Sequence, residues 1–170
     1  FARMADGLCA IPATDWDACA GHDNPFISHA FLSALEESGR PWATRGGQPL
    51  PILTDGADGR PAAMAPAYAK SHSQGEYVFD HSWAGAMERA GGHYYPKLQI
   101  AVPFTPVPGR RLLTDEPGLA LGLIAAAEEV VRQNGLSSAH ATFIAPSEAP
   151  LFERAGWLIR VDSQFHWHNE

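Results

Sequence analysis

The sequence has 170 residues, 45% of them apolar and 18% charged, a composition typical of one globular domain that argues against a disordered chain. Its net charge of −7 argues against non-specific binding to nucleic acid, and its longest mainly apolar stretch, residues 119–131, is too short and polar to cross a bilayer. Its cysteines, Cys9 and Cys19, are expected to be reduced thiols of a cytoplasmic protein.

The charge is unevenly distributed along the chain. Residues 60–111 contain six basic and three acidic residues, a local balance of +3 in an acidic protein. A locally cationic segment of this kind could hold an anionic ligand such as a phosphate. Solvated surface charges would explain the same pattern equally well.

The first half of the sequence predicts a helix, a hairpin and a second helix. Asn24-Pro25 and Ser28 are good helix openers, and apolar residues follow at helical spacing, so a helix is expected over residues 28–38. Residues 50–54 and 62–69 flank a turn rich in Gly and Asp and predict a hairpin, with Pro66 making its second arm a bulged or edge strand. A short strand is expected over residues 76–80 and a helix over residues 83–90.

The second half predicts alternating strands and helices. Strands are expected over residues 97–105 and 138–144, with a long helix over residues 119–133 between them. A right-handed crossover would then place the two strands in one mixed sheet flanked by helices, which is an α/β architecture. A short helix is expected over residues 147–155.

The alternating pattern at the end of the chain predicts a last strand with one buried and one polar face. The residues expected to be buried are Trp157, Ile159, Val161, Phe165 and Trp167. Those expected to face solvent or a partner are Arg160, Asp162, Gln164, His166 and His168. His166 and His168 could ligate a metal, but no third ligand has diagnostic spacing, so no metal site is expected.

The order of elements in the second half, with the run Leu151-Phe152-Glu153-Arg154-Ala155-Gly156-Trp157, resembles the C-terminal half of a GNAT acyltransferase domain. Four segments, residues 24–32, 70–80, 94–98 and 103–107, resemble a family of bacterial predicted N-acyltransferases linked to peptidoglycan biosynthesis and recognition. That family is similar to the Fem-type peptidyltransferases, which carry two GNAT-like halves and attach amino acids from aminoacyl-tRNA to cell-wall precursors. The resemblance implies that residues 1–170 form a single GNAT-like domain, the N-terminal half of a protein whose second half is absent here.

The resemblance has one departure that concerns the cofactor. GNAT enzymes hold the pyrophosphate of acyl-coenzyme A with backbone amides of a glycine-rich loop directly before a helix. In the corresponding loop here, Pro103, Pro106 and Pro108 remove amide donors. This half is therefore expected to bind no cofactor in the usual way and to show little acetyl transfer by itself. Acyl-coenzyme A or aminoacyl-tRNA remains the expected donor for the full-length protein.

Candidate site residues are polar groups expected at strand ends, where open α/β sheets bind ligands. The candidates for binding a substrate are Lys70, His72, Tyr95, Lys97, Thr105 and Arg111. Ordinary capping bonds and a solvated basic pair would explain these residues without a ligand. Glu76 and Asp80 are the candidates for a general base that deprotonates an attacking amine.

The sequence therefore favours an N-acyltransferase in which an amine attacks an activated acyl carbonyl directly, without a covalent enzyme intermediate. Its expected partners are a small-molecule or peptide substrate and the missing C-terminal half, with a homo-oligomer left open. The main alternative is a non-catalytic recognition module that binds a cell-wall peptide or another anionic ligand. A metal-dependent hydrolase is a distant third.

Overall fold

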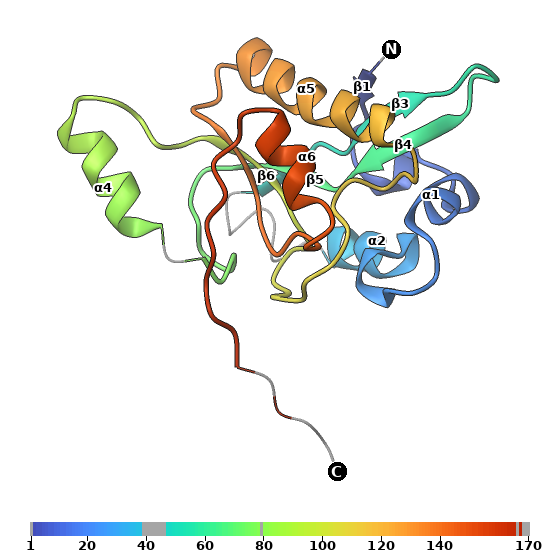
Figure 1. Cartoon of the computed structure of the whole chain (residues 1–170), viewed down its shortest axis with the longest axis horizontal. Coiled ribbons are helices and arrows are strands. Elements are labelled where there is room, and N and C mark those ends of the chain that lie inside the picture. Colours follow the sequence, from blue (N-terminus) through green and yellow to red (C-terminus); the bar gives the residue numbers. More distant parts are fainter. Residues whose placement is uncertain (1, 39–46, 79, 166, 168–170) are drawn as a thin grey trace.

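A computed structural model of the chain describes residues 2–38, 47–78, 80–165 and 167 (Figure 1). The strands are β1 (Ala2–Met4), β2 (Gly47–Pro49), β3 (Ile52–Asp55), β4 (Pro61–Ala65), β5 (Ala67–Lys70), β6 (Lys97–Ile100) and β7 (Ala139–Ala141). The α-helices are α1 (Ala13–Ala20), α2 (His29–Glu37), α4 (His81–Arg89), α5 (Pro117–Asn134) and α6 (Ala149–Arg154), and the 3-10 helices are η1 (Leu8–Ala10) and η2 (Pro25–Ile27). The expected α/β class with flanking helices is confirmed, but the described strands form two sheets, and the one that contains β6 and β7 is the mixed sheet.

The described strands hydrogen-bond as two sheets that meet at Pro66. One sheet has the order β1-β3-β4 and the other the order β2-β5-β6-β7. β4 and β5 follow each other with only Pro66 between them, and proline has no amide hydrogen to continue a ladder. The predicted second arm of the hairpin, residues 62–69, is therefore two strands that belong to different sheets.

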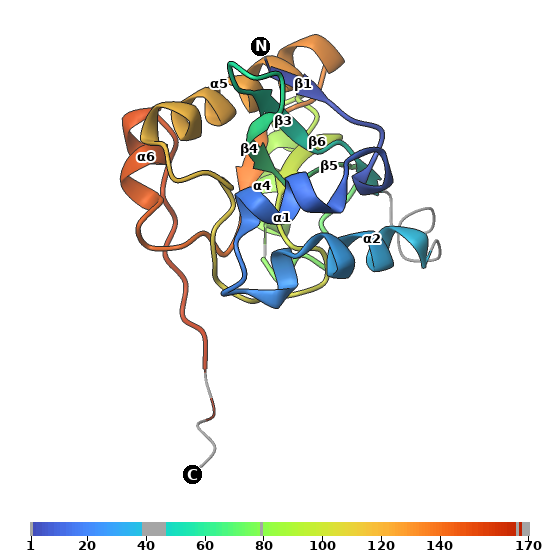
Figure 2. The same ribbon diagram turned by 90° about the vertical axis from the view of Figure 1, so that its right-hand side faces the viewer.

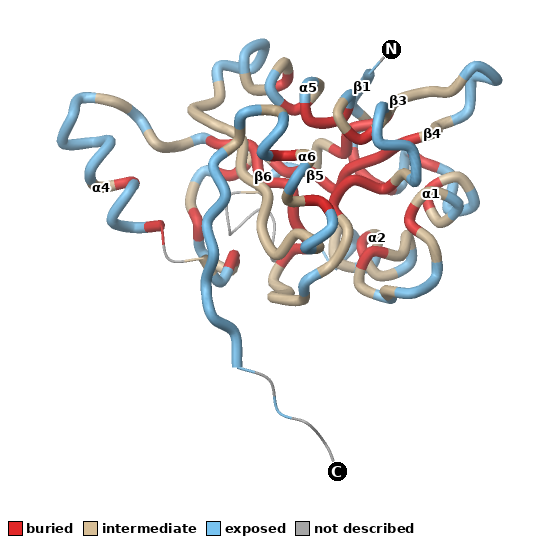
Figure 3. Tube along the Cα trace, in the orientation of Figure 1, coloured by how far each residue is buried: buried red, intermediate tan, exposed pale blue. Residues whose placement is uncertain are grey.

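Helices cover both faces of the strands β3 and β4. Ile52 and Ala63 pack into one core together with α5, whereas their neighbours Leu53 and Met64 pack into a second core with α1 and α2. This alternation is what the period of two in a β-strand requires. Figures 2 and 3 show α5 on one side of the buried strands and α1 and α2 on the other.

The crossover from β6 through α5 to β7 is confirmed. β6 and β7 pair in parallel, with Leu98 opposite Ala139 and Ile100 opposite Ala141. α5 begins at Pro117, a favoured first helical residue, and ends at Asn134, where the capping Gly135 has a φ of 62° in the left-handed region. The carboxyl ends of two adjacent parallel strands therefore lie side by side, which positions the residues that follow each strand.

Three predicted strands are shortened or absent, among them the strand expected over residues 138–144, which is reduced to Ala139–Ala141. The described residues of the segment 76–80 form no strand: Tyr77 has a φ of 54°, which no extended strand accommodates, and Phe79 lies outside the described residues. The strand expected over residues 97–105 ends at Ile100, because Pro103 cannot donate to a ladder and Phe104 has a φ of 54°. All four residues of β6 are buried, so its alternation does not separate a core face from a solvent face.

The predicted last strand is wrong. No described residue after α6 is in a strand, and the chain there extends away from the body (Figures 1 and 2). Val161 is 89% exposed and Phe165 is 100% exposed, although both were expected to be buried. Trp157 does pack against Phe152, with ring centroids 5.1 Å apart. An alternating sequence forms a strand only beside another strand, and the described residues provide none for it.

Candidate functional site

Lys97 is the centre of a buried polar cluster. It begins β6 and is only 1% exposed. Its ammonium group donates hydrogen bonds to Ser73 Oγ, Glu76 Oε2 and Asp80 Oδ2, each at 2.8 Å. A lysine ammonium has three protons, so all of its donors are engaged. Lys97 can therefore bind an anion only by giving up one of these bonds.

The strand register explains why a carboxylate is needed here. Lys70 ends β5 and lies directly opposite Lys97 in the antiparallel pair of β5 and β6. Two like charges in that position repel each other. Glu76 compensates for both: its carboxylate is 2.8 Å from Lys97 Nζ and 3.9 Å from Lys70 Nζ. With Asp80, the cluster contains two cations and two anions and is neutral overall.

Asp80 is held in its ionised form. Besides the Lys97 bond, its Oδ2 accepts hydrogen bonds from Ser73 at 2.7 Å and Tyr94 at 3.0 Å. Burial alone raises the pKa of Asp80, but the hydrogen bonds from Lys97, Ser73 and Tyr94 outweigh it and lower that pKa below its ordinary value. A carboxylate so stabilised in its charged form is a poor proton acceptor.

His140 borders the cluster from β7. Its Nε2 lies 2.8 Å from Ser138 Oγ, and its ring is 5.7 Å from the ring of Tyr94. Burial, reinforced by the positive charge of Lys97 and opposed by Asp80, lowers the pKa of His140 to about 4. The imidazole is therefore uncharged at neutral pH.

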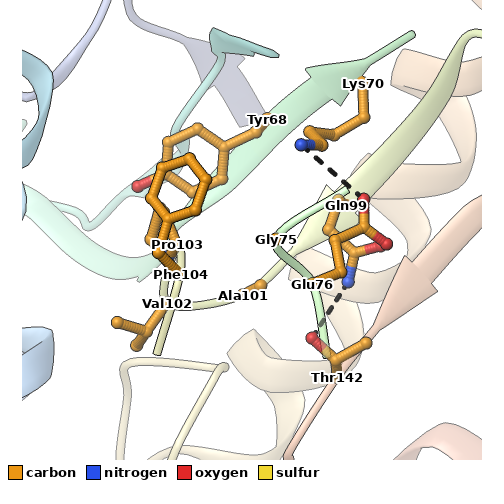
Figure 4. A pocket seen from close by; sticks show the side chains of 10 residues that line it. All are labelled: Tyr68, Lys70, Gly75, Glu76, Gln99, Ala101, Val102, Pro103, Phe104 and Thr142. Atoms are coloured by element: carbon orange, nitrogen blue, oxygen red, sulfur yellow. Dashed lines mark hydrogen bonds and ion pairs between the residues drawn. The ribbon is translucent and has the colours of Figure 1, made fainter. Parts of the chain in front are cut away.

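A small pocket lies where β6 and β7 end, next to this cluster (Figure 4). Its lining includes Tyr68, Lys70, Glu76, Gln99, Phe104 and Thr142. The pocket volume is about 20 Å³, enough for about one water molecule or one amino group. Glu76 brings a carboxylate to it from the loop after β5, and Gln99 brings an amide from β6. Asp80 does not line it.

Comparison with protein families now identifies the chain. Residues 7–170 match the model of the FemAB-like family, described as peptidoglycan biosynthesis/recognition. The chain belongs to the FemAB-like family. A comparison with curated proteins finds no match.

Solved structures resemble this FemAB-like chain over its full length. Aminoglycoside antibiotic 6'-N-acetyltransferase AAC(6')-Ig from Acinetobacter haemolyticus is 16% identical with a TM-score of 0.52, covering 100% of this chain and 99% of that chain. AAC(6')-Ih from Acinetobacter baumannii is 13% identical with a TM-score of 0.54 (100% and 98% covered), and a Trypanosoma brucei acetyltransferase is 13% identical with a TM-score of 0.51 (99% of each). At these identities the likeness shows the fold, which is that of the GNAT acetyltransferases.

The FemAB-like fold brings some of the predicted site residues together. Lys70, Tyr95 and Lys97 meet Glu76 and Asp80 in one cluster, where the Tyr95 hydroxyl is 2.8 Å from Ser73 Oγ. Their roles in binding a substrate and in accepting its proton stay predictions.

Other predicted residues lie apart from the cluster. His72 is half-buried and accepts a hydrogen bond from the amide of Gln74, and Thr105 donates to the carbonyl of Pro103. Arg111 is fully buried, and its guanidinium donates to the carbonyls of Thr142, Val107 and Arg110. Burial lowers the pKa of Arg111 to about 10. The six predicted binding residues therefore do not converge on one anion.

The loop between β6 and α5 uses its amides internally. Glu148, which is buried, accepts hydrogen bonds from the amides of Arg111 and Leu112 as well as Ala145. The amide of Gly109 donates to the carbonyl of Phe143 at 2.9 Å. The amides of Gly109, Arg111 and Leu112 belong to the loop that corresponds to the GNAT pyrophosphate loop, and each of them already donates to a protein acceptor.

Several residues of the site were missed from the sequence. Gln99 follows Lys97 by two residues on β6, and this period of two is the signal that could have found it. Ser73 and Tyr94 lie within the segments 70–80 and 94–98 but were not among the chosen site residues. His140 and Thr142 come from β7 and the residue after it, and no spacing pattern connects them to the other site residues.

The described residues contain no group of three or more His, Cys, Asp or Glu side chains that could hold a metal ion. His166 and His168, the residues weighed for a metal, lie outside the described part of the chain. Among the described helices, none has the length and apolar character of a membrane span. A larger groove of about 500 Å³ lies between residues 20–27 and residues 107–110.

Proposed function

We propose that this FemAB-like chain is the N-terminal half of a cytoplasmic N-acyltransferase that transfers an acyl or aminoacyl group to an amine of a peptidoglycan precursor. Its family is described as peptidoglycan biosynthesis/recognition, and its fold is shared with N-acetyltransferases, two of which are named for 6'-N-acetylation of aminoglycosides. These likenesses support transfer of an acyl group to a nitrogen atom. The choice of a peptidoglycan precursor as the substrate is based on the description of the family.

The observation that carries this proposal is the pocket at the carboxyl ends of β6 and β7. It has a buried carboxylate, Glu76, in the place where adjacent parallel strands of an α/β sheet bind ligands. An amine that attacks an acyl carbonyl must lose a proton as the bond forms. Glu76 is the candidate to receive it, because it lines the pocket, whereas Asp80 lies off the pocket and its Oδ2 already accepts three hydrogen bonds that hold the carboxylate in its ionised form.

The proposed reaction is direct. The amine lone pair forms a C–N bond with the acyl carbon, and the bond between that carbon and the sulfur or oxygen of the donor breaks. The amine proton passes to the Glu76 carboxylate, and the donor leaves as a thiolate or alcoholate that is protonated by solvent. No side chain of this half needs to carry the acyl group.

The acyl donor, an acyl-coenzyme A or an aminoacyl-tRNA, is proposed to be held mainly by the second half of the protein. The occupied amides of Gly109, Arg111 and Leu112 support this division, since each would have to exchange its acceptor to bind a pyrophosphate. The same observation favours the alternative function, a recognition module without catalysis. The neutral charge of the cluster speaks against an anionic ligand for such a module.

A product assay tests the proposal. The full-length gene product and the 170-residue chain would each be incubated with aminoacyl-tRNA or acetyl-coenzyme A and a peptidoglycan stem peptide that has a free side-chain amine. Mass spectrometry should show an amide product with the full-length protein and little or none with the chain alone. No amide with either protein would favour the recognition module, whereas full activity of the chain alone would overturn its assignment as half an enzyme.

A further inference from the structure

Two buried oxygen atoms that line the pocket have no hydrogen-bond partner among the described residues. One is Oε1 of Glu76, a residue 9% exposed, and the other is Oε1 of Gln99, a residue 2% exposed. Glu76 uses its other oxygen for Lys97, and Gln99 uses its amide nitrogen for Thr142 Oγ1 at 3.0 Å. Both side chains thus present an acceptor without a hydrogen bond.

Glu76 Oε1 gains no hydrogen bond from Lys70, the other lysine of the cluster. Lys70 Nζ is 3.9 Å from Glu76 Oε1, which is an ion pair but too long for a hydrogen bond, and it donates instead to the carbonyl of Gln74. Buried acceptors are almost always satisfied, so two open ones at one pocket indicate a missing donor. The pocket volume of about 20 Å³ admits a single small group carrying that donor.

We propose that the pocket binds the head of an unbranched primary amine, whose two N–H groups are accepted by Glu76 Oε1 and Gln99 Oε1. A hydroxyl or a secondary amine has one such hydrogen and would leave one oxygen open, and a carboxylate has none. The two lysines and two carboxylates of the cluster balance, so the amine is favoured in its uncharged form. With both hydrogens held, the amine's lone pair stays available for attack.

This inference rests on the proposed acyl transfer and narrows it to one class of acceptor: a primary amine at the end of a slender chain, such as a lysine-type side chain. It also assigns Gln99 a new role as a residue that determines specificity. Glu76 would both orient the amine and receive its proton, while Gln99 would only orient it.

Small probes test the pocket without any need for turnover. Methoxyamine is a slender primary amine that is uncharged at neutral pH, and N,O-dimethylhydroxylamine differs from it by a methyl group in place of one N–H. Ethanol and acetate complete the set. Each would be titrated into the 15N-labelled chain, with binding followed by NMR at the Gln99 side-chain amide and the backbone amides of Gly75 and Thr142.

We expect methoxyamine to shift these signals and to bind about tenfold or more tightly than the other three probes, since each of those loses at least one hydrogen bond to a buried acceptor. Gln99→Met should remove that preference. Thr142→Val, which removes the neighbouring hydrogen bond but keeps the Gln99 oxygen, should retain it. The inference would be overturned if ethanol or acetate bound as tightly as methoxyamine or more tightly. It would also be overturned if methoxyamine shifted none of these signals. Both outcomes are measured on the wild-type chain, so they stand even if the variants fail to fold.

The two proposals fail separately. Acyl transfer to a hydroxyl, or to an amine without methoxyamine binding in this pocket, would refute the amine pocket and leave an acyltransferase. Selective methoxyamine binding without any transfer by the full-length protein would refute the enzyme and leave an amine-binding pocket.

Discussion

Replacing Lys97 by methionine should strongly destabilise the protein. Methionine has nearly the same length and no charge, so the change removes the ammonium group and little packing volume. Glu76 and Asp80 would then be buried, and the ion pair left to them among the described residues would be that between Glu76 and Lys70, at 3.9 Å.

The expected loss in the free energy of unfolding follows from the three hydrogen bonds that Lys97 makes. Removing one partner of a buried ion pair costs about 3–5 kcal/mol, because the remaining charge is left without compensation. Two carboxylates lose their closest cation here and Ser73 Oγ loses a donor, so the upper half of that range is expected. The penalty should become smaller on acidification, when both carboxylates are protonated and need no counterion.

Urea unfolding near neutral pH would measure the effect. The Lys97→Met midpoint should fall with little change in the slope, and Arg89→Met, at an exposed residue of α4, is the matched control with an expected loss within about 0.5 kcal/mol. Adding Glu76→Gln and Asp80→Asn to Lys97→Met should recover part of the loss. A loss below about 1 kcal/mol for Lys97→Met alone would refute the structural role of this lysine and return it to the candidates for ligand binding.

Three further predictions concern stability. The folded-state pKa of His140, about 4, lies below its unfolded value of about 6.5, so about 3 kcal/mol of stability should disappear as the pH falls through that interval. His140→Asn should flatten this part of the stability–pH profile, and parallel profiles for the two proteins would contradict the prediction. Glu148→Ala should cost about 2–4 kcal/mol in urea unfolding, because three backbone amides lose their acceptor, and a loss below about 1 kcal/mol would show that the loop finds other acceptors. Phe165→Ser should change stability by less than about 0.5 kcal/mol, since the side chain is fully exposed; a loss above about 1 kcal/mol would mean that the tail packs on a surface in solution.

Local patterns predicted the helices well. The apolar stripe and end signals of the 119–133 segment are contained within one element, and α5 has nearly those bounds. The cap at Ser28 likewise forms as expected, with its hydroxyl accepting from the amide of Phe31. Such signals need no knowledge of distant residues.

The errors at the last predicted strand and at Lys97 depend on neighbours that are distant in sequence. The alternation after Trp157 satisfies every local requirement for a strand, but no described strand lies beside it. Lys97 is predicted from the sequence as a substrate-binding cation at a strand end. Its burial in an ion-pair cluster depends on Ser73, Glu76 and Asp80, which lie 24, 21 and 17 residues away. The type of a charged residue does not indicate whether residues distant in sequence will pack against it and bury it.

The most direct test of the central claim is the rate of amide formation by the full-length protein with Glu76→Gln. If Glu76 receives the amine proton, kcat/KM should fall by about 100- to 10,000-fold while the variant stays folded. The same chemical change at the exposed Glu153 should leave the rate within about twofold of the wild type. A Glu76→Gln variant that is folded and as active as the Glu153→Gln control would contradict the account.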